Sequence, residues 1–161
     1  MSRSEPGAPA REAGLLNEVV SNLREGLGDD LVAVVLFGSR ARGDAHEGSD
    51  WDVLVIARRL PGRTLERAIR LKRMLPPDHR GEVSLLAKTP EEFTAGLPDL
   101  YLDFAVDGIV LYDADGFMGE RLRFLRGLIR RKGLHRERED GDLMWRWPPA
   151  SDWSREWEEA P

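Results

Sequence analysis

The chain has 161 residues, a formal net charge of -5 at pH 7 and 33% charged residues, which suits one soluble domain with a sizeable core. Without cysteine, disulfides and zinc–thiolate sites are excluded, and the acidic balance argues against a dedicated nucleic-acid-binding protein. No apolar run approaches the roughly 20 residues of a membrane span, so we expect a cytoplasmic protein with no membrane attachment.

The first half of the chain alternates predicted helices and strands. Leucine and valine at helical spacing predict an amphipathic helix over residues 10–27. The continuous apolar run LVAVVLF (31–37) and the run WDVLVIA (51–57), apolar apart from Asp52, predict strands that are buried on both faces. A further helix is predicted over residues 64–75, with these side chains facing inward: Leu65, Ile69 and Leu75.

The second half continues in the same manner. The predicted elements are strands over 82–87 and 109–112, and helices starting at Thr89 and spanning 98–107 and 116–132. After the turn signal Asp140-Gly141, alternation around Trp145 predicts a small hairpin.

The segment between the first two strands begins with a candidate phosphate-binding turn. A buried strand ends at Phe37 and is followed at once by Gly38 and Ser39. Glycine lets the backbone approach a ligand closely, and the free N–H groups at a helix start favour an anion. Arg40 and Arg42 add positive charge nearby. These four residues are therefore predicted to bind phosphate groups.

The same segment ends with a candidate metal site. Asp50 and Asp52 are two residues apart at a strand start, so both side chains leave the same face. Crowded carboxylates repel each other, and neither stays ionised comfortably without a cation. Mg²⁺ typically binds one or two carboxylates together with phosphate oxygens. The pattern predicts magnesium-dependent nucleotidyl or phosphoryl transfer.

The segment GSRARGDAHEGSDWDVLVIA (38–57) resembles the signature of the minimal nucleotidyltransferases of the polymerase-beta-like superfamily. The segment YLDFAVDGIVLYD (101–113) is similar to one in stand-alone prokaryotic members, and the order of elements extends the resemblance to about residues 15–112. The resemblance implies an α+β fold, in which helices flank a small mixed sheet of about four strands. We expect this domain to span residues 10–133.

The resemblance also implies an activity: transfer of a nucleoside monophosphate from a nucleoside triphosphate, expected to be ATP, to an acceptor hydroxyl. Gly38 and Ser39 would hold the triphosphate, and Asp50 and Asp52 would bind two Mg²⁺ ions. The acceptor and the base preference are not indicated by the sequence.

The chain departs from the family at the third carboxylate. Counting back from Thr89, the position of that aspartate is occupied here by Ser84, which is neutral. Glu82 lies on the same face of the predicted strand, roughly 6–7 Å away. We therefore predict Glu82 as the third ligand and general base, with a solvated carboxylate as the alternative.

Three alternatives for the whole chain remain open. Besides the enzyme, the same site suits a catalytically weakened, nucleotide-binding regulatory module, antitoxin-like, that acts with a partner protein. A nucleic-acid-binding face is the third, because residues 121–132 are rich in arginine. Residues 134–161 hold four of the five tryptophans and are expected to pack on the domain or to be partly disordered. A homodimer is compatible with exposed sheet edges.

Overall fold

A four-stranded mixed sheet forms the centre of the protein, in the computed structural model that describes residues 8–148. The strand order is β3–β2–β1–β4, with β1 antiparallel to both β2 and β4, and β2 parallel to β3. The strands are β1 (Leu31–Phe37), β2 (Trp51–Ala57), β3 (Val83–Lys88) and β4 (Ile109–Asp113). The predicted α+β fold is confirmed.

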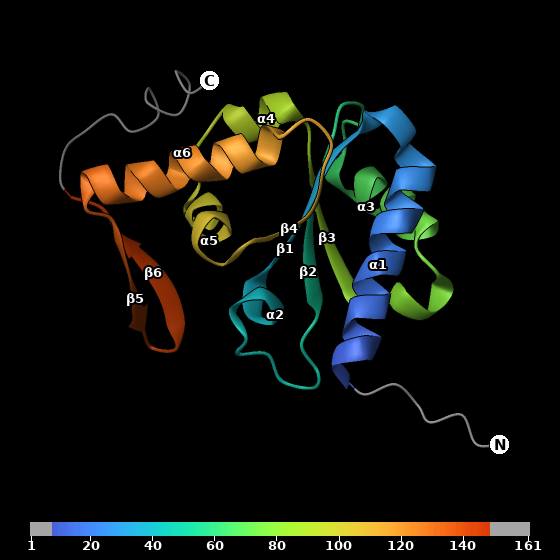
Figure 1. Ribbon diagram of the computed structural model, residues 1–161, viewed down its shortest axis with the longest axis horizontal. Coiled ribbons are helices and arrows are strands. Elements are labelled where there is room, and N and C mark those ends of the chain that lie inside the picture. The colour runs from blue at the N-terminus through green and yellow to red at the C-terminus, as the bar shows by residue number, and fades with distance from the viewer. Residues whose placement is uncertain (1–7, 149–161) are drawn as a thin grey trace.

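Helices cover both faces of this sheet (Figure 1). The first and third helices lie on one face, and the last three lie on the other. They are α1 (Ala8–Leu27), α2 (Gly38–Arg42), α3 (Thr64–Met74), α4 (Pro90–Thr94), α5 (Asp99–Asp107) and α6 (Phe117–Lys132), with 3-10 turns at Gly28–Asp30 and Pro77–His79. Within residues 8–148, no helix combines the length and apolarity needed to cross a membrane.

Alternation along the two central strands creates two apolar cores. In β1, Ala33 and Val35 point toward α4, α5 and α6, whereas Val34 and Leu36 point toward α1 and α3. Because both faces are covered, the two central strands are apolar apart from Asp52, which lies near the start of β2. The same alternation directs Trp51 to the α1 side and Leu54 to the α5 side, which fixes the direction of the residues at the start of β2.

Helix α3 buries a different face from the one that the sequence predicts. Leu65 and Ile69 are 71% and 43% exposed, whereas Arg67 and Leu71 face the interior. The cause is the Arg67 guanidinium, which donates to the Ala87 carbonyl at 3.3 Å and is paired with Glu92 on α4. The prediction that Leu65 and Ile69 face inward was wrong, because hydrophobic spacing does not reveal a buried, fully partnered arginine.

The Arg67–Glu92 pair makes stability depend on pH. Both guanidinium Nη atoms donate to the Glu92 carboxylate at 2.7 Å, and this bonding lowers the pKa of Glu92 to about 2. A carboxylate with a lowered pKa stabilises the fold above its unfolded pKa, and the stabilisation disappears as the pH falls through the folded pKa. Because the Glu92 side chain is 40% exposed, screening reduces the effect to on the order of 1 kcal/mol.

We expect Glu92→Gln to lower the free energy of unfolding by on the order of 1 kcal/mol at pH 7. The difference from the parent protein should shrink below the unfolded pKa of 4.5 and be largely gone near pH 2. Urea denaturation at several pH values measures both free energies. Glu91→Gln, on the same exposed helix turn, is the control. A difference that is equal at both ends of the pH range would contradict the ion-pair explanation.

The predicted C-terminal hairpin is present and packs on α5. Asp103 of α5 accepts from Arg136 Nη1 at 3.0 Å and from Trp145 Nε1 at 2.9 Å, and Arg136 also donates to Asp107 at 3.1 Å. These two carboxylates hold the pKa of Arg136 above its ordinary value. The hairpin strands are β5 (His135–Glu139) and β6 (Asp142–Arg146). The predictions for residues 149–161 lie outside the described part of the chain.

Candidate active site

The phosphate-binding turn and the aspartate pair meet at one edge of the sheet. Phe37, the last residue of β1, lies opposite Asp52 of β2, and Asp52 lies beside Ser84 of β3. Strand alternation turns Asp52 toward the α5 side of the sheet, away from Trp51. The short helix α2 begins at this same edge (Figure 1). Residues separated by some 45 positions in the sequence are thus brought together.

Gly38 packs directly against Asp52. Its φ of +72° lies in the left-handed region, and a Cβ placed on it would be 2.3 Å from Asp52 Oδ2. A side chain at this position would therefore collide with the carboxylate and strain the backbone. The geometry requires glycine between the end of β1 and α2, and it lets the backbone of the turn approach the carboxylate.

Asp50 and Asp52 form a carboxylate pair whose mutual repulsion is only partly compensated. Burial and the nearby Asp50 carboxylate raise the pKa of Asp52 above its ordinary value, and the Arg42 guanidinium partly offsets this. Hard oxygen donors that repel each other are suited to a cation such as Mg²⁺. The donor set therefore fits the metal that the resemblance implies, which Asp50 and Asp52 would hold.

The two predicted arginines have different surroundings. Arg40 donates to the Ser49 carbonyl at 3.0 Å and lies over the Trp51 ring, 4.7 Å from its centre. The structure thus places Arg40 on the Trp51 side, where it fixes the loop after α2. Arg42 contacts Asp44 Oδ2 at 3.3 Å and acts electrostatically on Asp52. Of the two, Arg42 is the arginine that lies with the aspartate pair.

The Glu82 backbone lies beside the aspartate pair, since its carbonyl accepts from the Trp51 N–H at 2.8 Å, but its side chain contacts His79. The Glu82 carboxylate lies 3.7 Å from His79 Nδ1, and His79 Nε2 contacts Glu18 of α1 at 2.7 Å. Among residues 8–148, no three acidic or histidine side chains form a group ready to hold a metal. Ser84, by contrast, lies next to Asp52 and is exposed. The role predicted for Glu82 stays a prediction.

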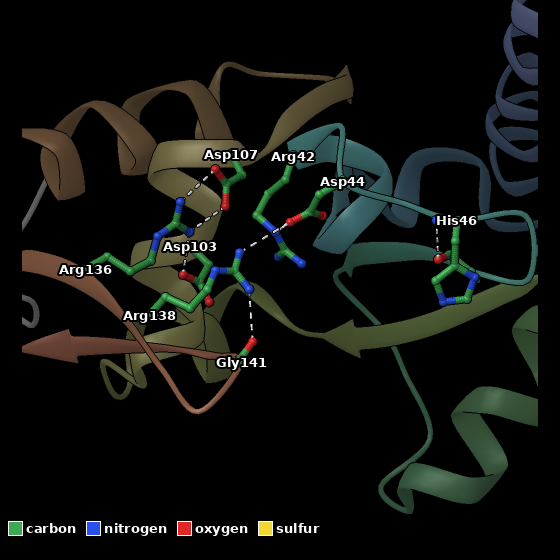
Figure 2. Close-up of polar contacts among 9 residues, drawn as sticks. Arg42, Asp44, His46, Asp103, Asp107, Arg136, Arg138 and Gly141 are labelled. Carbon is green, nitrogen blue, oxygen red and sulfur yellow. Dashed lines mark hydrogen bonds and ion pairs between the residues drawn. The ribbon is translucent and has the colours of Figure 1, made fainter.

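The C-terminal hairpin reaches the rim of this site. Arg138 of β5 lies 3.6 Å from Asp44, the residue that Arg42 also contacts (Figure 2). Neither Asp44 nor Arg138 is among the site residues that the sequence predicts. The contact joins segments about 90 residues apart, and the only sequence signal was the alternation of Arg136 and Arg138 along one strand.

Comparison with protein families gives one match over most of the described fold. A family model described as a nucleotidyltransferase domain matches residues 16–111. A protein of Methanocaldococcus jannaschii that is named as a protein adenylyltransferase is 31% identical over 121 residues, which cover 73% of this chain and 82% of the relative.

Solved structures share the fold. One is a toxin–antitoxin structure with AMP-PNP, with a TM-score of 0.51 and 20% identity. Another is a mutant of the MntA–HpeT toxin–antitoxin, with a TM-score of 0.50 and 19% identity. Each comparison covers 73% of this chain and 92% of the other. At these identities the likeness concerns the fold alone.

Proposed function

We propose that this chain, which belongs to the nucleotidyltransferase domain family, transfers AMP from ATP to a hydroxyl group of an acceptor protein. Nucleotidyltransferase activity follows from the family. Adenylyl transfer and a protein acceptor are supported by the name of the Methanocaldococcus jannaschii relative. The observation that carries the proposal is Asp52, which is packed against Gly38 and crowded by the Asp50 carboxylate.

Each residue of the site has a role in this proposal. The turn at Gly38 and Ser39 holds the triphosphate, with Arg42 beside it, and Asp50 and Asp52 hold Mg²⁺. The metal supplies charge neutralisation on the triphosphate and on the departing pyrophosphate. The acceptor oxygen forms a bond to the α-phosphorus, and the bond from that phosphorus to pyrophosphate breaks. The hydroxyl proton passes to a base, for which Glu82 is the candidate.

The experiment is transfer of label from ATP carrying radioactive α-phosphate. The purified protein with Mg²⁺ is incubated with peptides that contain tyrosine, serine or threonine, and with a cell lysate as a protein source. Labelled protein or peptide supports the proposal. If every acceptor stays unlabelled while ATP is bound, protein adenylylation is wrong for this chain. Parallel reactions with the other three labelled triphosphates measure base preference.

Glu82→Gln tests the predicted general base. The role requires the Glu82 carboxylate to turn from His79 toward the aspartate pair when substrate binds, and we expect the substitution to lower kcat by about a hundredfold. Steady-state transfer rates measure this. Glu18→Gln is the control, because it removes the other carboxylate at His79. An unchanged kcat would remove Glu82 from the reaction.

A second candidate function rests on Ser84. Where the family has its third carboxylate, this chain has an uncharged residue that lies beside Asp52. A nucleotide-binding module that acts with a partner protein would need no general base, and the likeness to toxin–antitoxin structures is compatible with a partner. Tight binding of ATP without transfer to any acceptor would favour this candidate. A homodimer also stays a prediction.

A further inference from the structure

Two arginines from distant segments meet on a single carboxylate oxygen. Arg42 Nε lies 3.3 Å from Asp44 Oδ2, and Arg138 Nη2 lies 3.6 Å from the same atom. Arg42 belongs to α2, at the candidate active site, whereas Arg138 comes from the C-terminal hairpin. Figure 2 shows the guanidinium groups of Arg42 and Arg138 next to the Asp44 carboxylate.

The anchoring of the hairpin determines where Arg138 lies. Arg136 and Arg138 alternate onto the same face of β5, so the contacts of Arg136 with α5 direct Arg138 toward the active-site loop. Arg138 Nη1 also donates to the Gly141 carbonyl at 2.9 Å, which fixes one side of the guanidinium. Arg146 lies on the opposite face of the hairpin, paired with Glu137 and Glu139.

The three charges are not balanced. One carboxylate is paired with two guanidinium groups, so these three side chains together carry a net positive charge. All three side chains are partly exposed, from 26% for Arg42 to 57% for Arg138, so these ion pairs are weak in water. A phosphate group carries more charge and accepts paired N–H bonds from arginine, so it would bind the two arginines more strongly than Asp44 does.

We propose that Arg138 and Arg42 together bind the terminal phosphates of the nucleoside triphosphate, and that Asp44 is the counter-ion which the phosphates displace. The position of Arg42 near Asp52 places this anion site next to the proposed metal ligands. Arg138 lies outside residues 16–111, so the contact is contributed by the hairpin and not by the part that matches the family. The inference rests on the proposed nucleotide site.

The test is binding of α,β-methylene-ATP with Mg²⁺, measured by titration calorimetry, together with the KM for ATP where transfer is observed. This analogue resists cleavage between its α- and β-phosphates. We expect Arg138→Gln to weaken binding and to raise KM by about tenfold, with kcat changed less than about twofold. Arg138→Lys, which keeps the charge but loses the planar fork, should lie between the two. Arg146→Gln, an exposed arginine on the outer face of the same hairpin, should bind like the parent protein.

Asp44→Asn distinguishes two explanations of the Arg138–Asp44 contact: Asp44 competes with phosphate for the arginines, or the contact only holds the hairpin in position. If Asp44 competes with phosphate for the two arginines, removing its charge should tighten binding of the analogue by about threefold. If the Arg138–Asp44 contact only fastens the hairpin, Asp44→Asn and Arg138→Gln should weaken binding alike. Changes of the same sign would therefore overturn the proposal. Thermal unfolding of each variant establishes that the fold is retained.

The outcome also separates this inference from the proposed function. A parent protein that binds the analogue, with Arg138→Gln indistinguishable from Arg146→Gln, overturns the role of Arg138 alone. Opposite effects of Arg138→Gln and Asp44→Asn support it even if no protein acceptor becomes labelled. A parent protein that does not bind the analogue overturns both.

Discussion

Asp52→Asn is expected to lower kcat for nucleotidyl transfer by about a thousandfold, equivalent to about 4 kcal/mol of transition-state stabilisation. The substitution keeps the shape of the side chain but removes one of the two charges that the proposed metal requires. Asn has one neutral oxygen, which is a weak ligand for a hard cation. Single-turnover transfer of labelled AMP measures the rate without interference from product release.

Asp52→Asn should not destabilise the protein, so a loss of activity in this variant would not be explained by unfolding. Because burial and Asp50 raise the pKa of Asp52, its ionised form destabilises the empty protein at neutral pH, and Asp52→Asn should be at least as stable as the parent. Mg²⁺ should raise the unfolding temperature of the parent but not of the variant, since binding to the folded state alone stabilises it. Asp115→Asn, an exposed carboxylate paired with Arg58, is the matched control. Transfer that survives in Asp52→Asn would exclude Asp52 as a metal ligand.

The fold was predictable where one physical signal dominates. Apolar runs gave the bounds of β1 (Leu31–Phe37) and β2 (Trp51–Ala57) without error, because strands buried on both faces are apolar throughout, apart from Asp52 near the start of β2. The convergence of Gly38 with Asp52 also followed from the sequence, since both lie where adjacent strands end or begin. Both features depend on local sequence patterns, and the pairing of neighbouring strands then determines where these residues lie.

Other features depend on contacts that no local pattern encodes. The face of α3 was mispredicted because Arg67 is buried by pairing with Glu92, which lies 25 residues away. The position of the Arg40 side chain depends on its contact with the Trp51 ring, and its predicted role at the nucleotide stays a prediction. Arg138 was missed because its position depends on the anchoring of the hairpin by α5. In each case the position of a charged side chain depends on a contact with a residue of another helix or strand.

Gly38→Ala tests the close approach on which the site depends, and we expect it to lower kcat by about a hundredfold. A Cβ at this position meets Asp52 Oδ2 at 2.3 Å and Asp52 Cγ at 3.1 Å, so the carboxylate has to move. A displacement of about 1 Å in a catalytic group costs about a hundredfold in rate. The left-handed φ of +72° adds roughly 1 kcal/mol of backbone strain to the cost in stability.

Gly116→Ala distinguishes the effect of backbone strain from the effect of the collision with Asp52. Its φ of +74° is nearly the same, but a Cβ there has no described atom within 4 Å, so this variant should lose only the stability that backbone strain costs and should keep full activity. If both variants lose activity alike, general destabilisation explains the loss and the contact with Asp52 does not. A double-mutant cycle between Gly38→Ala and Asp52→Ala gives the coupling directly. Because Asp52→Ala removes the two atoms nearest the new Cβ, the second substitution should recover stability that Gly38→Ala loses in the parent, and additive effects would mean that the two residues do not press on each other.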